Sequence, residues 1–472
     1  MVFSSNIFLI FFLPIFLICY FACPERWRNI VLLLFSVVFY AYGAPTFILL
    51  LLGSTILNFY LVKGLYNSDN LVHKKLFAGL AIAISLGLLA YFKYANFFVD
   101  NLNAVLGAFG LEPFTLAKVV LPIGISFFTF QSITYVVDTY RNVHKPMERL
   151  TDYMLYIIMF PQLIAGPIVR YCDIADEIRH REQNWPEILQ GFYRFVIGLS
   201  KKVLIADVIG RQVDTLLAGD LMTMGTGTAW LSLIAYSMQI YFDFSGYSDM
   251  AIGLGKMMGF HFPENFDNPY NSASVSEFWR RWHITLGAFM RNYLYFPLGG
   301  SRCSKPRTYF NLWVVFLLSG LWHGASWCFV IWGAYHGFWL VLERIGLKKV
   351  YEKIGKVPSV IITFFIVVIG RAFSRIENIS DSFTLISRLF SFDFQSFVPI
   401  QSPQFYVTLS LALVFSFIAL FPFGKKLQDL VYYTDFSKMQ HLVVWPVSIL
   451  LFVFCLTALN AVGFSPFIYF RF

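Results

Sequence analysis

Long apolar runs separated by short polar or basic loops extend from one end of this chain to the other. A transmembrane helix needs about 20 mostly apolar residues. Runs near that length occur at 5–22, 29–44, 46–62, 76–92, 119–137, 153–168, 225–243, 309–322, 325–342, 357–373, 404–422 and 442–461. The pattern predicts an all-α polytopic membrane protein with about 11–13 transmembrane or re-entrant helices.

Basic residues gather in alternate loops and predict the orientation of the chain. Cytoplasmic loops of membrane proteins carry an excess of Lys and Arg. The basic loops lie at 26–28, 74–75, 141–149, 344–356 and 425–438. This alternation predicts that both termini lie on the outer side. The run 5–22 is expected to be a retained span, because no basic residue precedes it and no small-residue cleavage site follows it.

The middle of the chain, from about 138 to 310, differs from the rest because Pro, Gly and charged residues interrupt its apolar runs. Lipid cannot satisfy irregular backbone or bare charge, so this stretch must be shielded by protein or line a wet cavity. No internal repeat or soluble linker divides the sequence. We therefore expect one membrane domain over 1–472, with its catalytic core at about 119–345.

Composition agrees with a membrane protein. Hydrophobic residues make up 58% of the 472 residues and charged residues 13%, against about 25% charged residues in an average soluble domain. The formal net charge of +9 comes from the loops between apolar runs, which favours a topological role over nucleic-acid binding. The six cysteines form no CxxC pair and no metal-ligand spacing, so no metal site is expected.

Three segments carry residues that could do chemistry: YFDFSGYSD at 241–249, SEFWRRWHIT at 276–285, and the stretch 320–337 with its LWHG and WGAYHG strings. His323 lies between two apolar runs that form a predicted hairpin. An ionisable residue at such depth is a functional candidate, although a histidine that bonds two helices is the structural alternative. His336, on the returning run, could equally be catalytic or support a neighbour.

His283 follows an arginine pair and two tryptophans, Trp279 and Trp282. Arg280 and Arg281 could bind a donor phosphate, because a guanidinium matches phosphate geometry. Alternatively, they reach the membrane surface and only set the topology.

Asp243 and Asp249 are six residues apart and do not share one helical face. Ion pairing with arginines is the favoured role for the two aspartates, and a catalytic role as general acid and general base is the alternative. The sequence has no Walker-type phosphate loop, no GxSxG elbow and no HExxH helix. A neutral histidine base therefore fits better than a covalent nucleophile. The base would take the proton of an acceptor hydroxyl whose oxygen attacks an already electrophilic thioester, and such general-base catalysis raises the rate about 10²–10⁴-fold.

Together these segments resemble the membrane-bound O-acyltransferase family, and within it the bacterial branch that contains the alginate O-acetylation membrane protein. The resemblance is spread over most of the chain and becomes less distinct after about Lys349. It rests on MVFSSN at 1–6, YFKYANF at 91–97, LPIGISF at 121–127, LIAGP at 163–167, FDFSGYSDMAIGLG at 242–255, EFWRRWHI at 277–284 and LWHG at 321–324.

The resemblance implies that His323 is the signature histidine and general base, with His283 as its partner. It implies a ring of tilted helices around a central pore in the bacterial inner membrane. The donor would be acetyl-CoA or an acyl thioester carrier from the cytoplasm, with no permanently bound cofactor. An extracytoplasmic partner of the SGNH-hydrolase type would complete O-acetylation of a polysaccharide such as alginate. Other members act on cellulose or peptidoglycan, or help to D-alanylate teichoic acid.

Two other classes of protein share some of these features. A secondary transporter or flippase for a lipid-linked glycan would also have many spans and intramembrane charges, but the two halves contain no corresponding pair of interrupted segments. A non-catalytic scaffold of a polysaccharide secretion complex would use its histidines structurally. Thioester hydrolysis or acyl transfer by the purified protein separates the enzyme from both.

Overall fold

The computed structural model describes residues 1–397, 400–462 and 466–468 of the chain. Over these residues the protein is helical, and its only β-type pairing is an isolated antiparallel bridge between Phe266 and Trp282. The predicted all-α polytopic class is therefore confirmed. The chain forms two compact units, one of 1–184 with 255–263 and the other of 185–254 with 264–472, and each is described by itself.

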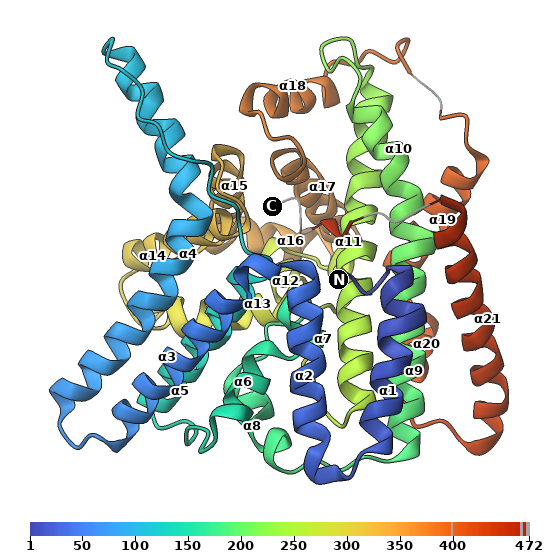
Figure 1. Cartoon of the computed structure of the whole chain (residues 1–472). Helices are drawn as coiled ribbons and strands as arrows, with labels where there is room; N and C mark the ends of the chain where they lie inside the picture. Colours follow the sequence, from blue (N-terminus) through green and yellow to red (C-terminus); the bar gives the residue numbers. More distant parts are fainter. Residues whose placement is uncertain (398–399, 463–465, 469–472) are drawn as a thin grey trace. The chain divides into compact units, whose positions relative to one another are not determined.

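The first unit contains the helices drawn from blue to teal in Figure 1. They are η1 (Ile7–Phe12), α1 (Leu13–Ala22), α2 (Glu25–Gly43), η2 (Pro45–Phe47), α3 (Ile48–Asn67), α4 (Leu71–Ala108), α5 (Ile125–Tyr140), α6 (Leu150–Ile158), α7 (Phe160–Leu163) and α8 (Tyr171–Arg179). Rings from η1, α1 and α2 surround Phe160, whose centroid lies 5.1 Å from that of Phe16 and 5.5 Å from that of Phe39. The contact with Phe16 is edge-to-face, an arrangement that stabilises an aromatic core.

The second unit begins with α9 (Trp185–Ser200), η3 (Lys201–Ala206) and α10 (Asp207–Leu217), which follow one another directly, and with α11, which runs over Thr226–Met257. It continues with η4 (Pro269–Asn271), α12 (Val275–Arg281), α13 (Ile284–Phe289), η5 (Met290–Tyr295), α14 (Lys305–His323), α15 (Trp327–Leu342), η6 (Glu343–Leu347), α16 (Lys348–Ile354) and α17 (Lys356–Arg375). It ends with α18 (Ile379–Leu389), α19 (Pro403–Phe417), η7 (Ile418–Leu420), α20 (Pro422–Tyr433) and α21 (Lys438–Val462).

Most predicted apolar runs are helices, but fewer of them are uninterrupted spans than the sequence suggested. Among the described residues, five helices are long and apolar enough to cross a membrane: Pro45–Asn67, Leu71–Ala108, Lys356–Arg375, Pro403–Leu420 and Lys438–Ala461. The predicted run 153–168 shows why others fall short, since it divides into α6 and α7 at Met159, two residues before Pro161. A proline lacks the N–H and the backbone freedom that a continuous helix needs.

The tightest helix pair of the second unit is the hairpin of α14 and α15. Two glycines allow this approach. A Cβ atom on Gly320 would collide with the backbone carbonyl of Phe329, and one on Gly333 would collide with that of Phe316. Small residues at such crossings let helix backbones come close within a membrane. The hairpin fixes the position of His323, which ends α14.

Candidate active site

His323 is the last residue of α14 and is buried at the turn of the hairpin. Its Nδ1 lies 2.6 Å from the carbonyl oxygen of Ser319, one helical turn earlier. Because a carbonyl only accepts, Nδ1 carries the proton in the neutral ring, and the lone pair is on Nε2. The helix therefore holds this imidazole in the tautomer that a general base requires at Nε2.

His283 connects α12 to α13 and adopts a left-handed backbone conformation, with φ of 48°. Residues other than glycine are rare in this region, and the strain persists where surrounding contacts fix it. Asn265 supplies those contacts. Its carbonyl oxygen accepts from Ile284 N at 3.0 Å, and its side-chain oxygen faces His283 Nδ1 at 3.0 Å and accepts from Thr285 Oγ1 at 2.9 Å.

The environment of His283 keeps its imidazole neutral. Burial, with a contribution from the nearby His323, holds the pKa of His283 well below its usual value. Desolvation disfavours the charged ring, and a second imidazole that can become positive disfavours it further. At neutral pH His283 is therefore a neutral ring beside His323.

Tryptophan rings bring the three predicted histidines into one cluster. The ring centroid of Trp322 lies 4.9 Å from His323 and 6.1 Å from His283. On the other side, Trp332 lies 4.8 Å from His323 and 4.9 Å from His336. The segments around 283, 323 and 336, well separated in sequence, thus meet in a mostly aromatic, buried environment.

His336 lies at the edge of this cluster, buried between aromatic rings. Its centroid is 5.0 Å from that of Trp279 and 5.4 Å from that of Tyr335. Among the residues that the structure describes, its Nδ1 has no hydrogen-bond partner. Trp279 also contacts Trp332, with centroids 5.4 Å apart. The geometry thus places His336 and Trp279 as the packing that holds Trp332 against His323.

Arg371 of α17 is a residue of this site that the sequence analysis missed. Its guanidinium carbon lies 4.2 Å from the ring centroid of Trp282, the residue before His283. The side chain is buried, no carboxylate of the described residues pairs with it, and its Nε and Nη2 atoms have no acceptor there. An arginine inside the apolar run 357–373 was the signal in the sequence, since a charge at such depth usually marks a functional position.

The arginine pair of α12 has two different environments. Arg281 lies 2.8 Å from Glu277 and 3.6 Å from Asp267, so nearby carboxylates already compensate its charge. Arg280 is exposed and forms no ion pair with a described residue. Of the two, Arg280 is the one whose guanidinium remains available to a phosphate.

Asp243 and Asp249 of α11 both form ion pairs with the π-helical turn η3. Asp243 lies 2.7 Å from Lys202, which also contacts Asp207. Asp249 lies 2.6 Å from both Lys201 and Arg194. Ion pairing of the two aspartates was the favoured prediction, with arginines as partners; Arg194 is one such partner, and Lys201 and Lys202 are the others.

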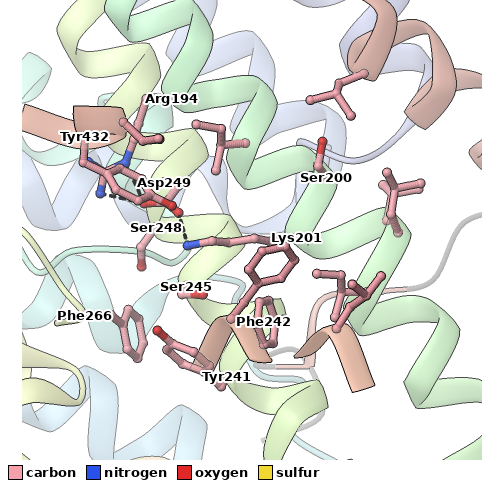
Figure 2. A pocket seen from close by; sticks show the side chains of 18 of the residues that line it. Arg194, Ser200, Lys201, Tyr241, Phe242, Ser245, Ser248, Asp249, Phe266 and Tyr432 are labelled. Carbon is pink, nitrogen blue, oxygen red and sulfur yellow. Dashed lines mark hydrogen bonds and ion pairs between the residues drawn. The ribbon is translucent and has the colours of Figure 1, made fainter. Parts of the chain in front are cut away.

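A cavity of about 670 Å³ lies beside this ion-pair cluster, and Figure 2 shows part of its lining. Its wall includes Asn265 and Ser248, and the Asn265 amide nitrogen donates to Ser248 Oγ at 3.1 Å. Asn265 therefore connects the cavity wall to His283. In the described part of the chain, no three His, Cys, Asp or Glu residues are grouped to hold a metal ion.

Comparison with known proteins identifies the family. The profile of the membrane-bound O-acyltransferase family matches residues 139–350, which include all three histidines. The chain is 46% identical to the probable alginate O-acetylase AlgI of Pseudomonas aeruginosa, over 83% of this chain and 75% of that protein. It is 42% identical to the protein of the same name from Pseudomonas putida, over the full length of both. It is also 35% identical to the peptidoglycan O-acetyltransferase of Helicobacter pylori, over 82% of this chain and 79% of that protein.

The matched region contains both elements that carry the geometry of the site, the α14–α15 hairpin and the strained turn at His283. Identity at this level over most of both chains places the protein in the AlgI-like bacterial branch. The chain is a member of the membrane-bound O-acyltransferase family, and it is an acyltransferase of multi-pass membrane architecture.

Proposed function

We propose that this acyltransferase takes an acetyl group from a cytoplasmic thioester, acetyl-CoA or an acyl carrier, and passes it across the bacterial inner membrane for O-acetylation of an extracytoplasmic polysaccharide. Alginate or a similar exopolysaccharide is the proposed acceptor, because the AlgI relatives are named alginate O-acetylases. The peptidoglycan enzyme among the relatives supports the broader class of envelope glycan.

The single observation that supports this chemistry best is the tautomer of His323. With Nδ1 bonded to the Ser319 carbonyl, Nε2 can take the proton of an acceptor hydroxyl as its oxygen attacks the thioester carbonyl. The C–O bond forms, the C–S bond breaks, and the imidazolium returns its proton to the departing thiolate. His283, held neutral by burial and in contact with Trp322, is assigned the role of partner to this base.

The remaining predicted residues have supporting roles in this proposal. Trp279, Trp282 and His336 pack the site, and Arg280 faces the phosphates of the donor. Asp243 and Asp249 hold the structure through their lysine partners. An SGNH-hydrolase-like protein outside the membrane would receive the acyl group and transfer it to the polymer.

The test uses the purified full-length chain in lipid nanodiscs with acetyl-CoA, the SGNH-type partner and acetyl-free alginate. Release of free thiol and appearance of acetyl ester on the polymer are measured separately. We expect His323→Ala and His323→Gln to lose both by at least about 10²-fold, the lower range for a general base. Control variants at Ser319, such as Ser319→Ala, keep the backbone carbonyl and should retain activity.

Near-normal transfer by correctly inserted His323→Gln protein would overturn the assigned role. A transporter or scaffold would release no thiol in any variant. If thiol release occurs but no ester appears on alginate, the acyltransferase chemistry stands and the acceptor must be sought among other glycans.

A further inference from the structure

The cavity shown in Figure 2 lies in the second unit and contains none of the three histidines in its lining. Its walls come from α9, η3, α10, α11, α19, η7, α20 and α21. A volume of about 670 Å³ falls in the range of small-molecule sites, about 300–1,000 Å³. The catalytic mechanism proposed above gives this space no role.

One side of the cavity is apolar and open toward the surroundings of the helices. Leu411 and Phe415 of α19 and Phe454 of α21 line it, and each remains about half exposed or more. Helix α19 packs on α10, and α21 packs on α9, while no extensive packing joins α19 to α21 in the described residues. Both helices are long and apolar enough to span a membrane. The half-exposed apolar lining from α19 and α21 therefore lies where the acyl chains of a bilayer can reach it.

Another part of the lining is charged, with both signs present. Arg194 lies 2.6 Å from Glu264 and from Asp249, and Asp249 also lies 2.6 Å from Lys201. Asp207 and Arg211 also line the cavity, so its six charged lining groups sum to zero charge. The ring of Tyr432 lies beside both cations, 4.3 Å from Arg194 and 5.4 Å from Lys201, an arrangement visible in Figure 2.

This charged part of the lining is close to the basic stretch 425–438, which the sequence places at the cytoplasmic surface, because Tyr432 belongs to that stretch. Tyrosine and charged side chains at such a boundary are typical of the headgroup level of a bilayer. A ligand with charges of both signs matches this balanced set, whereas a purely anionic ligand meets no net positive charge in the lining.

A second observation indicates that the cavity has an occupant. Ser245, one helical turn before Asp249 on α11, is buried and lines the cavity, yet its Oγ has no hydrogen-bond partner among the described residues. Buried hydroxyl groups are nearly always bonded, because an unmade bond costs free energy. A polar atom of a bound molecule, at the boundary of the charged and apolar parts, would complete it.

We propose that this cavity binds one zwitterionic phospholipid from the membrane, with an acyl chain between α19 and α21 and its headgroup at Arg194, Lys201 and Glu264. The ester region of the lipid accepts the hydrogen bond of Ser245. Because Ser248 and Asn265 form part of the same wall, the lipid also supports the segment that holds His283. This proposal does not depend on the identity of the acyl acceptor.

The experiment measures lipid retention by the full-length protein with native mass spectrometry. Delipidated protein in mild detergent is supplied with phosphatidylethanolamine, with phosphatidylglycerol, or with soluble glycerophosphoethanolamine, which has the headgroup alone. We expect one retained phosphatidylethanolamine, at least tenfold weaker retention of phosphatidylglycerol, and no competition by the soluble headgroup.

Cavity-filling variants locate the site. Ala458→Trp on α21 and Ala419→Trp on η7 place a large side chain in the lining. Val453→Trp on α21 and Val407→Trp on α19 add the same side chain at exposed positions outside the lining. We expect the two lining variants to lose at least tenfold in phosphatidylethanolamine retention, and the two controls to retain it.

Equal retention by lining and control variants would overturn the proposal, as would equal retention of phosphatidylglycerol and phosphatidylethanolamine. Competition by the soluble headgroup would show that the acyl chain is not part of the recognition and would overturn it as well. Two independent lining variants guard against misfolding of one, and size-exclusion profiles identify folded protein. Lipid retention is read without any acyl transfer, so failure here and failure of the proposed reaction are distinguishable.

Discussion

Replacing Asn265 with Leu tests whether this buried amide positions His283. The substitution removes four side-chain hydrogen bonds, to His283 Nδ1, Thr285 Oγ1, Thr285 N and Ser248 Oγ. At about 0.6 kcal/mol each for side-chain bonds within membranes, or about 1 kcal/mol each in general, the loss of stability is about 2–4 kcal/mol. If about half of this free energy is lost from the positioning of His283 in the transition state, the rate of acyl transfer falls about tenfold.

The chain provides a matched control for this substitution. Asn271 is also buried, but its side-chain amide makes no hydrogen bond to a described residue. Asn271→Leu thus changes the same chemical group without removing bonds. Steady-state thiol release and the thermal midpoint of nanodisc-embedded protein are measured for both variants. We expect both quantities to fall in Asn265→Leu and to stay near wild type in Asn271→Leu.

Asn265→Asp gives a readout that a purely structural role would not produce. A carboxylate at this place still accepts from His283, and its negative charge raises the pKa of His283 from its depressed value. The neutral ring is then lost at a higher pH, so the acid limb of the activity profile should move upward. An unchanged pH profile in folded Asn265→Asp, or equal losses in the two Leu variants, would refute the positioning role.

Three further predictions concern charges. Lys201→Met leaves Asp249 buried with Arg194 as its remaining partner and should cost about 1.5–3 kcal/mol, the contribution of a hydrogen bond between charged groups, seen as a lower thermal midpoint; an unchanged midpoint would contradict the ion-pair role. Arg280→Ala should raise the KM for acetyl-CoA, and the increase should grow at high salt. Arg281→Ala should raise this KM less, because Arg281 is already paired with Glu277. An unchanged KM in Arg280→Ala would mean that Arg280 only sets the topology. The loop 344–356 is predicted to be cytoplasmic, so Lys349→Cys in a cysteine-free background should react with an impermeant thiol reagent only after the cells are opened. Labelling in intact cells would show that the predicted orientation is wrong.

The sequence predicted the elements of this protein well, because a helix in a bilayer is specified mainly by its own residues. The apolar runs that overlap α2, α3, α14, α15, α17 and α21 over most of their length could be located without tertiary information. His323 could be identified for the same reason, since an ionisable group between two apolar runs is unusual wherever those runs pack.

Only the tertiary structure decided which side chains meet. Asn265 faces His283 across 18 positions of the chain, Lys201 faces Asp249 across 48, and Arg371 stacks on Trp282 from a separate helix. These contacts depend on how closely helices approach and at which rotation, which the glycines of the α14–α15 hairpin set through packing. A hydropathy pattern records which residues avoid water, but it does not contain the distances between helices, and those distances fix the histidine tautomers, the ion pairs and the cavity beside them.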